Sequence, residues 1–157
     1  MAPLIALVLG TLAARLAGWL GADYVGSWPA AVAVGLSAMF LVTGIAHFVN
    51  PLRRDLIAIV PPQLPALGPI APHVRGLLVT ATGVLEVLGA VGLLYPATRP
   101  VAAISLGVMM LAMFPANVYA SRMPSPPKSM TTQLPLRTVE QIVFIGAALV
   151  VGLGGIQ

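Results

Sequence analysis

Five apolar stretches, each long enough for a membrane-spanning helix, constrain this sequence more than any other feature. A spanning helix needs about 20 apolar residues, because the hydrocarbon core is roughly 30 Å thick and each residue advances about 1.5 Å. Only 8% of the 157 residues are charged, which excludes a soluble enzyme, a disordered segment and a nucleic-acid-binding protein. We predict an all-α transmembrane helical bundle in a single domain, residues 1–157, with five spans at residues 3–21, 29–49, 74–95, 101–121 and 137–155.

Proline positions support these boundaries, because proline lacks a backbone donor and is tolerated best in a first helical turn or a loop. Pro29 and Pro100 open helices, and most other prolines lie between spans. Pro115 falls inside a span, where we expect a kink. The first stretch has the alternative of a secretory signal, but it lacks a basic start and carries Arg15 within its apolar run. We therefore expect a retained helix.

Basic residues are distributed unevenly between the two sides of the predicted bundle. One side has only Arg15 and Arg99, and the richer side should face the cytoplasm. This predicts a multi-pass protein of the plasma membrane with a cytoplasmic N-terminus and an exported C-terminus. The basic residues on the richer side are Arg53, Arg54, Arg75, Arg122, Lys128 and Arg137. The aromatic residues predicted at the opposite interface are Trp19, Tyr24, Trp28 and Tyr95.

The loop at residues 50–73 contains a segment, residues 52–60, that begins with charged residues and continues with apolar ones. We expect a short helix there that lies in the membrane interface. Its basic residues either meet anionic head groups or serve only as topology signals, and the sequence leaves both interpretations open.

Glu86 is the clearest ionisable residue inside a span. It lies eleven residues after Arg75, about 16 Å farther along the helix axis and so near the middle of the membrane. A carboxyl group at that depth is costly and raises a functional question. It is either a proton-carrying or ligand-binding acid, or a protonated acid that donates one interhelical hydrogen bond. Gly83 and Gly89 lie one turn to either side and would let a neighbouring helix approach closely.

Other polar residues are predicted at a similar depth. His47 ends the second span, Asn117 follows Pro115 in the fourth, and Gln141 lies near the start of the fifth. Counted from the loops, they occupy the cytoplasmic half of the bilayer, with Glu86 just beneath them. We therefore expect a polar pocket open to the cytoplasmic leaflet, a ligand-binding or proton-relay site with these members: His47, Asn50, Glu86, Asn117 and Gln141.

Each member also has a structural explanation. A histidine near a helix end is often only hydrogen-bonded, and the structural explanation for Asn117 is that it satisfies carbonyl groups that Pro115 leaves without a donor. We expect Arg137 and Glu140, three residues apart at a helix start, to form a solvated ion pair. The chain has no cysteine, no phosphate-binding glycine loop and no metal-ligand or catalytic motif. No catalytic residue and no metal site are predicted.

Several motifs carry a family resemblance: GIAHFVNP (44–51), IVPPQLP (59–65), TGVLEVLGAVGLLYPATR (82–99), MFPANVYA (113–120) and LPLRTVEQIVFI (134–145). In this order they resemble the DoxX-like family of small bacterial integral membrane proteins, over roughly residues 30–150. The resemblance implies a four-helix bundle, to which this chain adds one N-terminal helix, and a bacterial inner membrane. Some relatives are subunits of a thiosulfate:quinone oxidoreductase or associate with oxidative-stress enzymes.

Three functions are left open. The first, which we favour, is a non-catalytic subunit or a module that binds a small lipid or quinone, linked to redox or oxidative-stress systems. The second is a proton-coupled carrier or channel that uses Glu86. The third is a quinone-linked oxidoreductase, for which the sequence offers no motif that binds an electron carrier. No cofactor is evident and a quinone is the candidate. The expected partners are membrane lipid, other membrane redox subunits and a second copy of the chain, and no nucleic acid.

Overall fold

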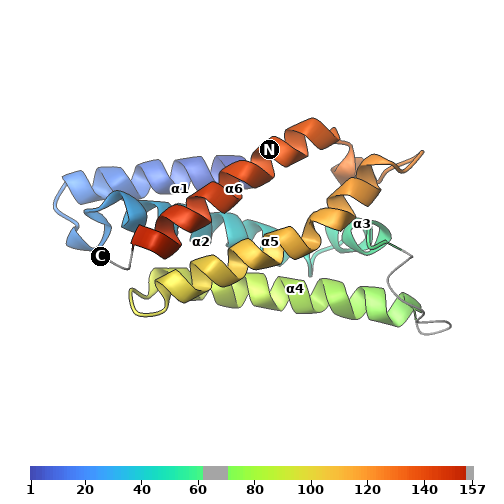
Figure 1. Ribbon diagram of the computed structural model, residues 1–157, viewed down its shortest axis with the longest axis horizontal. Coiled ribbons are helices and arrows are strands. Elements are labelled where there is room, and N and C mark those ends of the chain that lie inside the picture. Colours follow the sequence, from blue (N-terminus) through green and yellow to red (C-terminus); the bar gives the residue numbers. More distant parts are fainter. Residues whose placement is uncertain (62–70, 155–157) are drawn as a thin grey trace.

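The protein is described by a computed structural model that covers residues 1–61 and 71–154 and is helical there, without a strand (Figure 1). Five helices are long and apolar enough to cross a membrane, which confirms the predicted all-α bundle. The long helices are α1 (Ala2–Trp19), α2 (Trp28–Ala46), α4 (Ala71–Leu94), α5 (Arg99–Ser121) and α6 (Leu134–Gly154). The short helices are η1 (Asp23–Val25), α3 (Leu52–Ala58) and η3 (Lys128–Met130).

All five long helices begin earlier than predicted, α4, α5 and α6 by two or three residues. These three helices each contain a proline in their first turn, where the missing N–H would have no helical partner anyway. Of these prolines, Pro100 was predicted to open a helix, whereas Pro72 and Pro135 were predicted to lie in loops. At the other ends, α1 and α2 stop two and three residues before their predicted limits. The predicted last residue of the fifth span, 155, lies outside the described residues.

α2 is the centre of the bundle. It packs against α1, α4 and α6, while α5 packs between α4 and α6. Leu36, Met39 and Phe40 of α2 are buried among small and branched side chains of the other helices. One buried polar link joins α2 to α4, where the hydroxyl of Ser37 donates to the Ala90 carbonyl at 2.8 Å. α2 therefore fixes where α4 and α6 present their polar residues.

Glycine permits the closest helix contact, between α1 and α2. A Cβ added to Gly35 would lie 2.5 Å from the carbonyl oxygen of Leu7, and one added to Gly10 would lie 3.0 Å from the Gly35 Cα. Without a hydrophobic effect between helices in lipid, such backbone approach supplies the packing energy. α1 is thus an integral part of the bundle.

One end of the bundle carries the two isolated arginines. Arg15 donates to the Gly26 carbonyl at 2.8 Å, and its guanidinium lies over the rings of Trp19 and Trp28. Arg99 donates to the Leu93 carbonyl at 3.1 Å and lies over Tyr24. Backbone carbonyls and aromatic rings therefore hold both charges beside the α1–α2 and α4–α5 connections.

The opposite end contains α3 and the α5–α6 connection. α3 confirms the short helix predicted from residue 52, and it packs against α4. Ser129 of η3 donates to Asp55 of α3 at 2.5 Å. α5 remains helical through Pro115, and Figure 1 shows its orange C-terminal part leaving α4 toward α6. This divergence separates α4 from α5 at the end that carries α3.

Candidate functional site

The site is built where α2 ends against the middle of α4. Gly44 of α2 faces α4, and Gly83 of α4 faces the end of α2. A Cβ on Gly44 would lie 3.3 Å from Glu86 Cβ, and one on Gly83 would lie 2.5 Å from His47 Cβ. The two helices can approach this closely only because both positions lack a side chain. Their contact places His47 and Glu86 together, with 3% and 4% of their surfaces exposed.

His47 completes the C-terminal end of α2. Its Nδ1 lies 2.8 Å from the Thr43 carbonyl oxygen, while the His47 backbone N–H donates to Gly44 instead. The ring therefore satisfies a carbonyl that the end of the helix would leave without a donor. A carbonyl oxygen can only accept, so Nδ1 carries the proton of this hydrogen bond.

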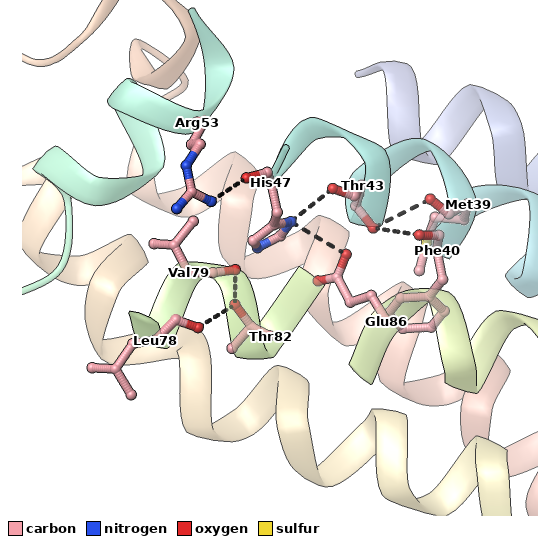
Figure 2. Close-up of polar contacts among 9 residues, drawn as sticks. All are labelled: Met39, Phe40, Thr43, His47, Arg53, Leu78, Val79, Thr82 and Glu86. Carbon is pink, nitrogen blue, oxygen red and sulfur yellow. Dashed lines mark hydrogen bonds and ion pairs between the residues drawn. The ribbon is translucent and has the colours of Figure 1, made fainter. Parts of the chain in front are cut away.

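Glu86 faces the same nitrogen. Its Oε2 lies 3.7 Å from His47 Nδ1, which is an ion-pair distance but too long for a hydrogen bond. Figure 2 shows Nδ1 directed toward both Thr43 and Glu86, with the other ring nitrogen turned away from Glu86. No described residue donates a hydrogen bond to Glu86 Oε2. Because an unpartnered buried oxygen is costly, it needs a proton, a water molecule or a ligand.

Arg53 fixes the position of His47 from the loop side. Its guanidinium donates to the His47 carbonyl at 2.8 Å and to the Thr80 hydroxyl at 2.9 Å, as Figure 2 shows for the first contact. It thereby joins the end of α2 to α4. From the sequence, Arg53 was interpreted as a contact to anionic head groups or as a topology signal. A basic residue shortly after a helix end is also a pattern for capping the last carbonyls, and that signal was missed.

A cavity of about 180 Å³ lies between α2, α4, α5, α6 and the start of α1, and we name it the polar chamber. Asn117 and Gln141 meet in its wall, with Asn117 Nδ2 donating to Gln141 Oε1 at 3.5 Å. Arg137 Nη1 donates to Asn117 Oδ1 at 3.0 Å, and Gln141 Nε2 donates to the Met110 carbonyl at 2.7 Å. The polar side chains that line the chamber are Thr43, Glu86, Asn117, Arg137, Glu140 and Gln141.

A second cavity, of about 320 Å³, lies between α4, α5 and the end of α3, and we name it the apolar cleft. His47 and Thr82 contribute its polar side chains, while the remaining wall is apolar, including Leu78 of α4 and Val60 after α3. Met113 of α5 lines both the cleft and the chamber. The contact between His47 and Glu86 therefore bridges two cavities of opposite character.

The structure divides the predicted pocket. Glu86, Asn117 and Gln141 share the polar chamber, but His47 lines the apolar cleft and reaches the chamber through its contact with Glu86. Asn50 is exposed and lines neither cavity. Sequence spacing gives depth along a helix axis, and the rotation of each helix, which separates these two groups, depends on packing.

Arg137 and Glu140 differ from the solvated pair that the sequence suggested. Both line the polar chamber, and Arg137 is bonded to Asn117 and to the Thr132 carbonyl, at 2.9 Å, rather than to Glu140. Glu140 has 14% of its side chain exposed and lies 3.4 Å from the amino group of Met1. One side of the first two turns of α6 faces the chamber, so both charges belong to the site. Within the described residues, no group of three His, Asp or Glu side chains is arranged to hold a metal ion.

A protein-family model described as a domain of unknown function, DUF8561, matches residues 36–152, which is most of the chain. The chain belongs to the DUF8561 family. The part of the chain matched to DUF8561 begins within α2 and includes the chamber residues of α4, α5 and α6, whereas α1 precedes it. No curated protein and no solved structure matches this DUF8561 protein.

Proposed function

We propose that this DUF8561 protein is a non-catalytic membrane component that binds a small amphiphile carrying a hydroxyl group, a quinol or a lipid, in the apolar cleft. The observation that carries the proposal is the position of His47, which lines the cleft and contacts Glu86 of the polar chamber. The cleft volume of about 320 Å³ falls in the range of small-molecule pockets, about 300–1,000 Å³.

The tautomer of His47 supports the choice of ligand. Because Nδ1–H is committed to the Thr43 carbonyl, a neutral ring presents Nε2 as an acceptor. A hydroxyl group in the cleft would donate to that nitrogen. A quinone carbonyl would need Nε2 to be protonated as well, and Glu86 at 3.7 Å from the ring would stabilise the resulting imidazolium. The same site therefore suits a quinol when the His47 ring is neutral and a quinone when the ring is positively charged.

The rim of the cleft supports entry from the lipid phase. Leu78 on α4, together with Ala112 and Pro115 on α5, lines the cleft and is exposed on the bundle surface. In a membrane these side chains face acyl chains. An amphiphile would enter between α4 and α5 without crossing water and place its polar group against His47.

The proposal assigns binding rather than electron transfer. Oxidation of a quinol releases two electrons, and a partner membrane redox subunit would accept them. The motifs around His47, Glu86 and Asn117 resemble the DoxX-like family, in which some members are subunits of a quinone oxidoreductase, and this resemblance supports the assignment.

The test is a titration of the purified protein in nanodiscs with a short-tailed benzoquinol, and separately with a monoacylglycerol as the lipid hydroxyl. We expect one of the two to bind, and His47→Phe, which keeps a ring but lacks Nε2, to weaken that binding at least tenfold. Asn50→Ala, on the exposed turn, is the matched control and should bind like wild type. Equal binding by wild type and His47→Phe, or no binding of either probe, would refute the proposal.

We also propose that the end of the bundle with α3 and the α5–α6 connection faces the cytoplasm of a bacterium. The uneven distribution of basic residues supports this orientation. Because the chain has no cysteine, a membrane-impermeant thiol reagent tests it directly on intact spheroplasts. Ala97→Cys, in the α4–α5 connection, should be labelled from outside, and Lys128→Cys, in the α5–α6 connection, should be labelled only after lysis. The opposite pattern would reverse the orientation.

A further inference from the structure

The polar chamber is lined by residues with buried polar atoms that form no hydrogen bond with any described residue. Glu86 lines it and is 4% exposed, and its Oε2 accepts no hydrogen bond from a described residue. Glu140 Oε1, also buried, likewise accepts none from these residues. The hydroxyl of Thr43 lies near the Glu86 carboxyl group but also faces the carbonyls of Met39 and Phe40, at 3.3 and 3.4 Å. The amino group of Met1 lies 3.4 Å from Glu140 Oε1. These protein groups still leave one buried oxygen of each carboxyl group without a hydrogen bond.

Water meets the requirements of this cavity. Buried water occupies sites that are polar and roomy, makes two to four hydrogen bonds, and takes up roughly 30 Å³ per molecule. The chamber has about 180 Å³, which is enough for several molecules. Asn117, Arg137 and Gln141 supply further donors and acceptors around the same space. Filling it with water is cheaper than leaving the carboxyl oxygens unpartnered.

The chamber extends from the end of the bundle toward its middle. Arg137 and Glu140 lie in the first two turns of α6, and Arg137 also donates to Thr132 in the α5–α6 connection. Phe144, two turns after Arg137, lines the inner part, about 10 Å deeper along the helix axis. Glu86 lines the chamber from α4. The lining residues thus connect a loop of the protein with the acid in its interior.

From these observations we propose that the polar chamber is a hydrated half-channel through which Glu86 exchanges protons with the aqueous phase beside the α5–α6 connection. A proton arriving from bulk water passes to chamber water and then to the Glu86 carboxylate, which becomes the neutral acid. Glu140 lines the outer part of this path. The proposal goes beyond amphiphile binding and stands whether or not the apolar cleft binds a ligand.

The charged groups around Glu86 and its chamber come from the end of α2, from α3, from α6 and from the amino group of Met1, which lies 3.4 Å from Glu140 Oε1. His47 faces Glu86 from the end of α2, and Arg53 of α3 reaches the carbonyl of His47. Arg137 and Glu140 face the chamber from α6, whereas α5 contributes the neutral side chains of Asn117 and Met113. The positive charge of Arg137 and the negative charge of Glu140 therefore both face the space that Glu86 lines.

The first test uses single cysteines on α6 in this cysteine-free chain. Glu140→Cys and Phe144→Cys place thiols one turn apart in the chamber, and Ile142→Cys places one on the lipid-facing side, where Ile142 is 65% exposed. A small charged methanethiosulfonate reagent is attacked by a hydrated thiolate, which forms a mixed disulfide and releases methanesulfinate. In nanodiscs we expect Glu140→Cys and Phe144→Cys to react at least tenfold faster than Ile142→Cys. A Phe144→Cys rate equal to that of Ile142→Cys would show that the inner chamber is dry and refute the half-channel.

The second test keeps the wild-type lining and needs no ligand. The infrared carbonyl band of protonated Glu86, identified by its loss in Glu86→Gln, is recorded after transfer to D₂O at a pH where the band is present. We expect its deuterium shift to be complete in the first spectrum for wild type and for Thr82→Val, which alters only the cleft. Gln141→Leu, which replaces a polar lining side chain, should slow the shift at least tenfold. A wild-type band that remains unexchanged for hours would overturn the proposal, and benzoquinol binding would be unaffected by that outcome.

Discussion

Gly83 of α4 packs directly against the side chain of His47, so that a Cβ at position 83 would lie 2.5 Å from His47 Cβ and 3.0 Å from its Cγ. Carbon atoms do not approach to 2.5 Å without bonding, and His47 is held in place by Thr43 and Arg53. The absence of one methyl group thus determines the contact between His47 and Glu86.

Gly83→Ala should therefore destabilise the protein. Overpacking at this site should lower the free energy of unfolding by about 1–3 kcal/mol and weaken benzoquinol binding, because His47 must move. The measurement is a denaturant titration in mixed detergent micelles. Gly146→Ala on α6, whose added Cβ would meet no described atom within 4 Å, is the control and should be neutral or stabilising, since alanine is favoured over glycine in helices by up to about 1 kcal/mol. Equal stability of the two variants would contradict this account of Gly83.

Arg53 and Arg54 are a matched pair of variants for testing the contact of Arg53 with the end of α2 and with α4. Arg53 donates to the His47 carbonyl and to Thr80, while Arg54 is exposed. Hydrogen bonds made by charged groups contribute about 1.5–3 kcal/mol, so Arg53→Met should lower the unfolding free energy by about that amount. Arg54→Met should change it by less than about 0.5 kcal/mol. Thermal unfolding followed by circular dichroism compares them, and a similar loss in both variants would show that only net charge matters.

The contact between η1 and the C-terminal end of α4, at the opposite end of the bundle, offers a similar comparison. Tyr24 donates its hydroxyl to the Leu94 carbonyl, and Arg99 lies over its ring, whereas Tyr95 is 64% exposed. Tyr24→Phe removes the hydrogen bond and keeps the ring, so we expect a loss of about 0.5–1.5 kcal/mol. Tyr95→Phe should have no measurable effect on the same unfolding curve. A larger loss in Tyr95→Phe would contradict the hydrogen bond of Tyr24.

Much of this fold was predictable because its determinants are local. A long apolar run predicts each spanning helix, and prolines mark where helices begin, although α4, α5 and α6 include their first-turn prolines. The depth of Glu86, Asn117 and Gln141 follows from counting residues at a fixed rise per residue. These features need no knowledge of neighbouring helices.

The rotation of the helices was not predictable. In α4, Leu88 is exposed and Leu93 is buried, and both are equally apolar, so hydrophobicity does not indicate which side faces the protein. The separation of His47 from the polar chamber and the inward direction of Arg137 depend on this rotation. Contacts such as Gly83 with His47 set it, and they join residues far apart in the sequence.

Replacing Glu86 separates the two interpretations drawn from the sequence, a proton-carrying or ligand-binding acid and a structural hydrogen-bond donor. If it were a structural hydrogen-bond donor, its replacement by leucine would break an interhelical link. In the structure its Oε2 has no hydrogen-bond partner among the described residues, and replacing a poorly satisfied buried polar group with an apolar one of similar size is often neutral or stabilising. Glu86→Leu should therefore unfold at a denaturant concentration no lower than wild type while losing the proton exchange described above. Gln141→Leu is the contrasting variant, because Gln141 donates to the Met110 carbonyl at 2.7 Å, and it should lose about 1 kcal/mol. A Glu86→Leu variant that is less stable than Gln141→Leu would establish Glu86 as a structural residue.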